Sequence, residues 1–340
     1  MLLVVFIHLN TSSAHCMDTA SLTASAGKAL YYVLNILLSR NFAPLANGVF
    51  FFISGYLYFA NVKELDWSSY KRKTVSRIKT LLVPYLFWNI LCIGLYWIFG
   101  LIEGSSVSID LSCIWVMNVA EGGFYTPIDG PLWFIRDLFV QSLLLPLVIA
   151  FIVKKRHLLY LFLAVVLSLY CFDKCTVCFH PLAYTFFSFG CIWGAQKISF
   201  VNIMKGYSWV IVPISIIVYV ARVYFSINNT FIAQNTIMKL WPFCGICIIT
   251  LCSYYFVRKG RHILSTLNES SFFLYAIHVP FIIQPLYWYC YKFLKLEESI
   301  WGVNWVYIMT FFISVFVSVL LSRTLRRLVP RYIPLLTGGR

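Results

Sequence analysis

The amino-acid sequence predicts an all-α membrane protein, a bundle of about ten transmembrane helices with both termini in the cytoplasm. Of the 340 residues, 61% are hydrophobic and only 11% are charged, whereas soluble domains carry roughly 25% charged residues. The apolar residues gather in ten segments separated by polar connections. The basic residues concentrate in alternate connections, which is the distribution that sets the orientation of membrane proteins.

The apolar segments follow one another along the whole chain, with no soluble domain, long linker or internal repeat between them. The first is short, because a helix over residues 1–9 spans roughly 14 Å of a hydrocarbon layer about 30 Å thick. Either this helix begins inside the bundle or the natural chain begins upstream, and its composition is not that of a signal peptide. The predicted segments are 1–9, 43–60, 81–101, 131–153, 157–172, 181–196, 207–225, 236–257, 271–289 and 305–322.

The basic residues set the orientation of these segments. With the N-terminus in the cytoplasm, the opposite side collects acidic residues such as Asp110 and Asp129. We therefore expect a multi-pass protein of the cell (inner) membrane. The net charge of +15 reflects topology, and no nucleic-acid partner is expected. Most of the 27 Lys and Arg residues fall on the predicted cytoplasmic side, at positions 63–79, 154–156, 197–205, 258–261 and 323–340.

Two connections on the predicted outer side are longer than simple turns. Residues 10–42 include the amphipathic stretch GKALYYVLNILLSR, which we expect to lie in the membrane interface or to cap the bundle. Residues 102–130 form an acidic loop just ahead of the fourth apolar segment. Long loops of this kind are often functional.

Eleven cysteines are scattered along the chain, and most are expected to act as small hydrophobic side chains. The exception is CTVCFH, which contains Cys175 and Cys178. No second pair of ligands accompanies them, so no metal site is expected. A local disulfide would form there only if the loop faces an oxidising compartment.

The adjacent charges Arg136 and Asp137 stand out within PLWFIRDL. A charge at the centre of a membrane helix costs about 2.5–3.5 kcal/mol. Adjacent helical residues point roughly 100° apart, so we expect the two side chains not to form a face-to-face pair and to serve different neighbours. In one interpretation both lie at the outer interface, with Arg136 snorkelling to water and Asp137 near a helix N-terminus. In the other, Arg136 faces inward and has a function.

Two histidines lie in apolar segments. His8 is near the outer end of the first segment, and it is either an interfacial residue or a general base, because histidine titrates near neutral pH. His278 in SSFFLYAIH precedes Pro280, and we favour a structural role for it at a local distortion of the helix.

A basic cluster, KRKTVSRIK at residues 71–79, lies at the cytoplasmic mouth of the third segment. Positive-inside topology is sufficient to explain it. A phosphate-binding rim also explains it, because arginine guanidinium groups match phosphate oxygens. In FFFISGYL, the small residues Ser54 and Gly55 permit close approach of a neighbouring helix and need no chemistry.

Together these features resemble the acyltransferase 3 family of integral-membrane proteins, which includes O-acetyltransferases of bacterial surface polysaccharides. The resemblance rests on five motifs in order: a first segment ending at His8, FFFISGYL, RIKTLLVPYLFWN, PLWFIRDL and SSFFLYAIH. It implies a single acyltransferase domain over residues 1–340. It also implies a bundle of about ten helices that moves an acyl group, usually acetyl from acetyl-CoA, to a sugar hydroxyl.

The resemblance assigns candidate catalytic residues. His8 matches the histidine of the family's first span, the candidate general base. The family's arginine about eleven residues before that histidine would precede Met1 here. Arg136 lies within the PLWF block, and it is the candidate for stabilising the oxyanion or orienting the substrate.

The resemblance also assigns candidate residues for binding the donor. Arg77 matches the first arginine of a basic pair in the family. The second arginine of that pair is Thr80 here, with Lys79 beside it. Arg77, Lys79 and Arg72 are therefore the candidates for binding the phosphates of acyl-CoA.

We expect an acyl-CoA-dependent O-acyltransferase that works without a metal. Its partners would be cytoplasmic acyl-CoA, a cell-surface or lipid-linked glycan acceptor, and the lipid bilayer. The alternative is a multi-pass transporter or flippase for a glycan or lipid. Transporters often show paired repeats with broken helices in matching halves, and the sequence shows none.

Overall fold

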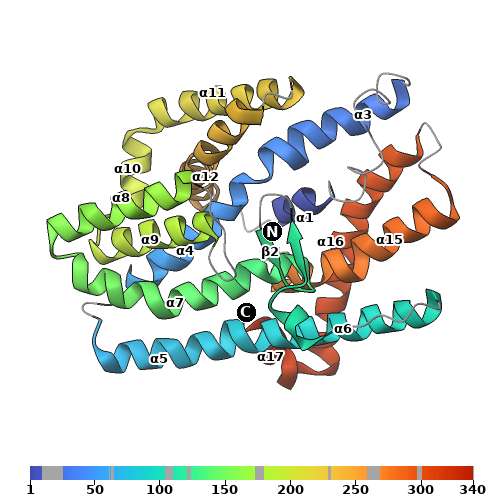
Figure 1. The fold of residues 1–340 in the computed structure, drawn as a ribbon, viewed down its shortest axis with the longest axis horizontal. Helices are drawn as coiled ribbons and strands as arrows, with labels where there is room; N and C mark the ends of the chain where they lie inside the picture. The colour runs from blue at the N-terminus through green and yellow to red at the C-terminus, as the bar shows by residue number, and fades with distance from the viewer. Residues whose placement is uncertain are drawn as a thin grey trace. The chain divides into compact units, whose positions relative to one another are not determined.

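A computed structural model describes most of the chain, and these parts are almost entirely helical (Figure 1). Within them, β1 (Asn118–Ala120) pairs with β2 (Phe124–Thr126) in a short antiparallel hairpin. The predicted all-α class is confirmed. Cys175 and Cys178 lie outside the described residues. The structure describes residues 1–9, 26–60, 62, 65–103, 110–120, 124–172, 180–228, 231–258, 269–296 and 301–339.

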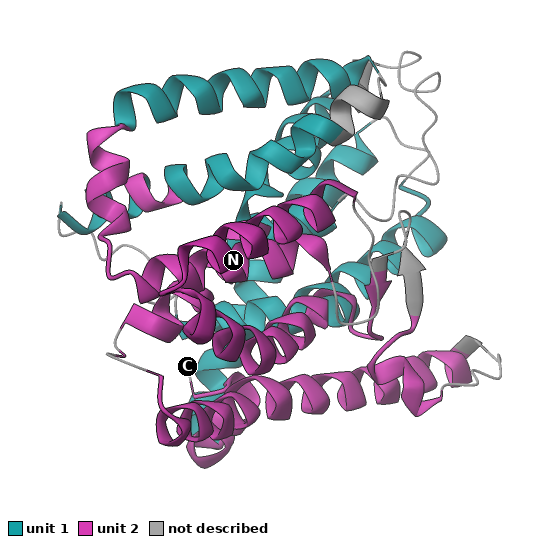
Figure 2. Cartoon of the chain, turned by 60° about the vertical axis from the view of Figure 1, so that its left-hand side comes forward, with its two compact units in different colours: residues 1–46, 208–248, 252–328 teal, residues 47–207, 249–251, 329–340 magenta. Residues whose placement is uncertain are grey.

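The chain folds into two compact units, which Figure 2 shows in separate colours. His8 and His278 belong to the first unit, whereas Arg136 and the basic cluster at residues 71–79 belong to the second. The first unit comprises residues 1–46, 208–248 and 252–328, and the second comprises residues 47–207, 249–251 and 329–340.

The first unit combines helices from the two ends of the chain. Its elements are α1 (Leu2–His8), α3 (Ala26–Leu34), η1 (Asn35–Phe42), α11 (Ser208–Ile227), α12 (Phe231–Arg258), α14 (Ser271–Ile277), η5 (His278–Ile283), α15 (Gln284–Trp288), η6 (Tyr289–Phe293) and α16 (Gly302–Leu328). The segments η1, η5 and η6 are π-helical. α16, drawn in red in Figure 1, contacts α1, α3 and α14, so it joins the N-terminal and C-terminal parts of this unit.

The second unit is built mainly from the middle of the chain. Its elements are α4 (Leu45–Ala60), α5 (Trp67–Arg77), η2 (Ile78–Leu82), α6 (Val83–Glu103), η3 (Leu111–Ile114), β1, β2, η4 (Gly130–Leu132), α7 (Trp133–Ile152), α8 (Arg156–Phe172), α9 (Pro181–Ala195), α10 (Phe200–Gly206), η7 (Pro330–Tyr332) and α17 (Ile333–Thr337). α7 packs against α8 and α9. The Trp88 indole N–H donates to the Leu336 carbonyl oxygen at 2.9 Å, which ties α17 to α6.

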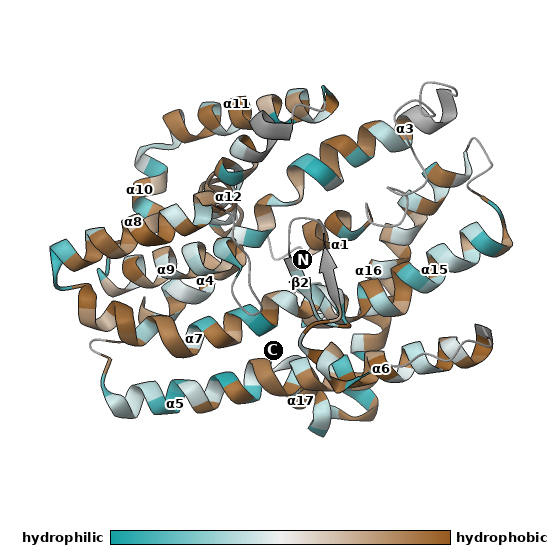
Figure 3. Cartoon of the chain, viewed as in Figure 1, coloured by the Kyte–Doolittle hydropathy of each residue, from teal (hydrophilic) through white to brown (hydrophobic). Residues whose placement is uncertain are grey.

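Six helical segments in the described parts are long and apolar enough to cross a membrane. All six overlap segments predicted from the sequence, and the shorter apolar helix α8 overlaps a seventh. Figure 3 shows α7 and α11 as apolar along most of their length and α5 as largely hydrophilic. The count of ten spans and the cytoplasmic placement of both termini stay predictions. The six segments are Leu30–Ala60, Trp67–Ile102, Gly130–Ile152, Ser208–Ile227, Thr236–Arg258 and Gly302–Leu328.

The amphipathic stretch before residue 43 differs from expectation. It forms α3 and η1, and from Leu30 it belongs to the same apolar helical segment as α4. The physical reason is burial, because Asn35, Ile36, Ser39 and Asn41 all point into the protein. An interfacial helix would keep such polar side chains in water.

Glycines allow two helices of the second unit to approach closely. A Cβ added at Gly190 of α9 would lie 2.1 Å from the carbonyl oxygen of Phe52 in α4. A Cβ added at Gly55 of α4 would lie 2.2 Å from the carbonyl oxygen of Phe187 in α9. Backbone therefore packs directly on backbone, which confirms the packing role expected for Gly55.

Candidate active site

His8 is the last residue of α1, and two contacts hold the end of that helix. The Tyr287 hydroxyl donates to the Leu9 carbonyl oxygen at 3.2 Å. The Phe6 ring stacks on Phe311 of α16, with centroids 4.3 Å apart. α1 is therefore fixed within the first unit, and it presents His8 as a partly exposed side chain.

The ring beside His8 is that of His278. The two imidazole centroids are 5.1 Å apart and the ring planes are inclined by 64°, so one ring meets the other edge-on. His278 is completely buried, and its Nδ1 lies 2.9 Å from the Tyr275 carbonyl oxygen. These residues are far apart in the sequence, and the fold of the first unit brings them together.

A buried apolar cluster adjoins the histidine pair. Leu9 and Val279, the sequence neighbours of the two histidines, both belong to it, as do Tyr287 and Val306. An apolar surrounding has a low dielectric constant, which strengthens the interactions of any polar group placed there. The pair is therefore a polar group of two side chains beside an apolar cluster.

The segment η1 adds buried polar residues to the first unit. The Asn35 amide donates to the Tyr31 hydroxyl at 3.2 Å. The Ser39 and Tyr307 hydroxyls share a hydrogen bond of 2.7 Å. Sequence reasoning missed these residues because it treated the stretch as an interfacial or capping helix and did not single out its polar residues. The available signal was the presence of Asn and Ser on the same apolar face of a helix.

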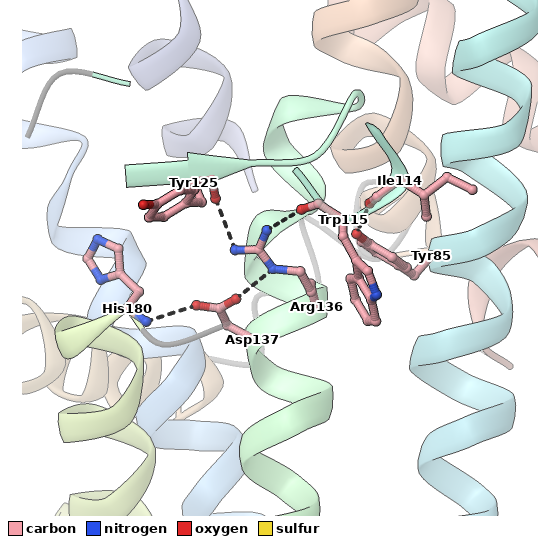
Figure 4. A network of polar contacts seen from close by, with 7 residues as sticks. All are labelled: Tyr85, Ile114, Trp115, Tyr125, Arg136, Asp137 and His180. Carbon is pink, nitrogen blue, oxygen red and sulfur yellow. Dashed lines mark hydrogen bonds and ion pairs between the residues drawn. The ribbon is translucent and has the colours of Figure 1, made fainter. Parts of the chain in front are cut away.

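In the second unit, Arg136 of α7 binds the connection between α6 and α7 through its guanidinium group (Figure 4). One terminal nitrogen donates to the Trp115 carbonyl oxygen at 2.6 Å. The other donates to the Tyr125 carbonyl oxygen, in β2, at 2.9 Å. Tyr85 of α6 donates its hydroxyl to the Ile114 carbonyl oxygen nearby. Arg136 therefore fixes the backbone at Trp115 and the β2 strand onto the N-terminal end of α7.

The expectation that Arg136 and Asp137 would not pair is wrong. Arg136 Nε lies 2.9 Å from Asp137 Oδ1, and both side chains are almost fully buried. The angular rule describes the direction of the Cβ atoms, whereas the long arginine side chain curls back toward its neighbour. Their burial also favours the inward-facing interpretation over the interfacial one.

Asp137 extends the network to α9. Its second oxygen, Oδ2, accepts the backbone N–H of His180 at 3.2 Å. The His180 ring Nδ1 accepts the backbone N–H of Leu182 at 3.2 Å and so caps the start of α9. Burial, together with the nearby Arg136 charge, lowers the pKa of His180 to about 4. His180 is therefore a neutral helix cap at pH 7.

Asp129 is a second buried carboxyl of this unit. Its backbone N–H donates to the Asn89 side-chain oxygen at 3.2 Å. Its side chain is fully buried, and neither carboxyl oxygen has a hydrogen-bond partner among the described residues. Burial raises the pKa of Asp129 well above its usual range, so the neutral acid is favoured. The sequence had placed this residue only among the outer acids.

The three candidate donor-binding residues lie on the continuous helical segment α5–η2. α5 begins after Asp66, whose carboxylate accepts the Ser69 N–H at 3.1 Å, and hydrogen bonds to Ser69 lower the pKa of Asp66. Arg77 is half-buried, with its guanidinium 5.9 Å from the centre of the Tyr58 ring. Arg72 and Lys79 are exposed.

The fold and these sites define an α-helical integral-membrane protein with a histidine pair in its apolar interior. A family model described as an acyltransferase domain matches residues 1–323. The chain belongs to the acyltransferase 3 family, as the motifs indicated, and is therefore a membrane acyltransferase. Comparison with curated proteins and with solved structures found no match.

Proposed function

We propose that the protein transfers an acyl group, acetyl in the first instance, from cytoplasmic acyl-CoA to a hydroxyl of a cell-surface or lipid-linked glycan. The observation that carries the proposal is the placement of His8. It is held at the end of a fixed helix, partly exposed, beside a second histidine in an apolar surrounding. A neutral imidazole in such a place is suited to accept a proton.

In the proposed reaction the acceptor hydroxyl oxygen attacks the thioester carbonyl carbon, and His8 takes the hydroxyl proton. The tetrahedral intermediate then collapses, the carbon–sulfur bond breaks, and His8 returns the proton to the departing thiolate. The products are the O-acylated glycan and free CoA. A positioned general base typically contributes about 10²–10⁴ in rate.

For the donor we propose that Arg77, Lys79 and Arg72 bind the phosphates of acyl-CoA. Arg72 and Lys79 are exposed and available to an anion from solution. Arg77 lies against Tyr58, which limits the number of positions its guanidinium adopts. Charge-assisted hydrogen bonds from such groups to phosphate are stronger than neutral ones.

For Arg136 the contacts support a positioning role in the outer connection. Its guanidinium already donates to Asp137 and to two backbone carbonyls. A direct role at the oxyanion would require it to exchange one of these partners for the substrate. The variant Arg136→Met and the double variant Arg136→Met with Asp137→Leu separate the two roles.

The experiment is transfer of label from acetyl-CoA in membranes that contain the acceptor, for the wild type and for His8→Ala. We expect His8→Ala to lose detectable transfer while its expression level and acetyl-CoA binding stay close to wild type. Cys290→Ala is the matched control, because it alters the same apolar cluster without touching the proposed base. An active His8→Ala variant would reject the base. If the wild-type protein transports glycan but transfers no acyl group, the alternative function, a transporter or flippase, is supported instead.

A further inference from the structure

The two ring nitrogens of His278 differ in their hydrogen bonding. His278 Nδ1 lies 2.9 Å from the Tyr275 carbonyl oxygen, and a carbonyl only accepts hydrogen bonds. The proton of the neutral ring is therefore on Nδ1, which leaves Nε2 as an acceptor with a lone pair. Nε2 is buried and has no hydrogen-bond partner among the described residues. Buried polar atoms normally have a hydrogen-bond partner, so the state of Nε2 indicates either strain or a functional role.

The neighbouring ring provides one. Two imidazoles joined by an N–H···N bond of about 3 Å have centroids roughly 5 Å apart. The centroids of His8 and His278 are 5.1 Å apart, in an edge-on arrangement. His8 is the partly exposed last residue of α1, and a turn of its ring about the side-chain bonds would point one N–H at His278 Nε2. His278 is fully buried, and its ring is anchored through Nδ1.

We propose that His278 is the positioning residue of the catalytic histidine: its Nε2 accepts an N–H of His8 and so fixes the tautomer and ring orientation of His8. This inference rests on the proposed function, in which His8 is the base. With one ring nitrogen of His8 donating to His278, the other carries the lone pair and faces the acceptor hydroxyl. Catalytic bases are commonly oriented in this way, by a third group that holds the ring nitrogen not used for proton transfer; here that group is His278.

The proton balance follows from this arrangement. The hydroxyl proton passes to the second ring nitrogen of His8 as the new carbon–oxygen bond forms. The resulting imidazolium keeps its other N–H on His278 Nε2, where the acceptor lone pair stabilises the positive charge. When the carbon–sulfur bond breaks, the proton leaves this second nitrogen of His8 for the thiolate. His278 keeps its own proton on Nδ1 throughout, so it acts through His8 and never touches the substrate.

The backbone supports a specialised role for His278. The α-helix α14 ends at Ile277, and the π-helical segment η5 begins at His278 itself. Short π-helical insertions often occur at functional sites, because they redirect a side chain relative to the helix that precedes it. Pro280 follows within η5 and lacks a backbone N–H, which favours such an irregular turn. The structural role expected from the sequence accounts for the distortion, but it does not explain why Nε2 lacks a partner among the residues that the structure describes.

The test compares His278→Gln with His278→Leu in the full chain. The amide of glutamine reaches the position of Nε2 and restores an acceptor there, whereas leucine keeps the bulk and removes it. We expect His278→Leu to lower kcat by about 10- to 100-fold, because the variant loses one hydrogen bond to the charged His8 ring. The KM for acetyl-CoA should stay close to wild type, and His278→Gln should recover much of the loss. Cys290→Ala serves again as the packing control.

A second readout separates positioning from packing. Side-chain nitrogen NMR of histidine-labelled protein in micelles reports the tautomer of His8, which should be fixed in the wild type and mixed in His278→Leu. A wild-type kcat in His278→Leu with an inactive His8→Ala variant overturns the inference and leaves the proposed function standing. Equal losses in folded His278→Gln and His278→Leu also overturn it, because an acceptor would then make no difference. An active His8→Ala variant defeats the proposed function itself.

Discussion

Replacing Arg136 by methionine removes one partner of a buried ion pair. The variant keeps the length and bulk of the side chain but leaves the Asp137 carboxylate buried without its 2.9 Å partner. Removing one member of such a pair typically costs about 3–5 kcal/mol, chiefly because the remaining charge is uncompensated. The Trp115 and Tyr125 carbonyls also lose their donor, but these contacts are only part-buried, so water can replace much of what is lost. We therefore expect Arg136→Met to lower the free energy of unfolding by about 3–5 kcal/mol in total.

The double variant Arg136→Met with Asp137→Leu isolates the source of that cost. With both charges gone, no uncompensated carboxylate remains, so the double variant should be more stable than Arg136→Met alone. Thermal unfolding of purified protein in detergent, followed by size-exclusion chromatography after heating, measures both. Acyl transfer is assayed in parallel at matched amounts of folded protein. If Arg136→Met proves as stable as wild type yet loses all transfer, the positioning argument fails and Arg136 acts directly in the reaction.

Three further outcomes are expected. Gly190→Ala should strongly lower the yield of folded protein in detergent, because its Cβ would lie 2.1 Å from the Phe52 carbonyl oxygen. The control Gly94→Ala has open space around the new Cβ and should behave like wild type, so equal yields of the two variants would contradict the packing of α4 on α9. Arg77→Ala should weaken acetyl-CoA binding by about 10- to 100-fold in equilibrium titrations, and exposed Arg156→Ala serves as the control. If the two variants bind acetyl-CoA equally well, membrane topology alone explains the basic cluster at residues 71–79. Single cysteines placed in a cysteine-free chain should be protected from an impermeant reagent at position 72 and labelled from outside at position 110; the reverse pattern would overturn the orientation.

The fold class was predictable because hydropathy is a local property of the sequence. Each long apolar helix of the described structure overlaps a predicted segment, since a run of apolar residues needs no knowledge of its neighbours. The stretch around Asn35 and Ser39 was harder to interpret. The sequence predicted only an amphipathic helix that lies in the interface or caps the bundle, whereas the structure buries its Asn35 and Ser39 against Tyr31 and Tyr307. The sequence cannot show which side of an amphipathic helix finds a polar partner.

The candidate site was predictable only in part, for a related reason. The resemblance singled out His8, but nothing local to His278 indicates that its ring meets a residue from the other end of the chain. For Arg136 the helical geometry gave a rule about directions, and the rule failed because a long side chain can bend back to its neighbour. Its other partners are backbone carbonyls, which every residue carries and which no sequence pattern marks.

The contrast between Arg136 and His278 explains why the two buried groups receive different roles. Burying a polar group in an apolar medium costs free energy unless that group is hydrogen-bonded. The Arg136 guanidinium recovers this cost through Asp137 and two carbonyls, so moving it toward a substrate would sacrifice contacts that it already has. Within the described parts of the chain, His278 Nε2 has no such contacts to lose, and the ring beside it is the partly exposed His8. A new hydrogen bond to Nε2 is therefore favourable at little cost. On this reasoning Arg136 stabilises the fold of its unit, and the histidine pair is where a proton can move.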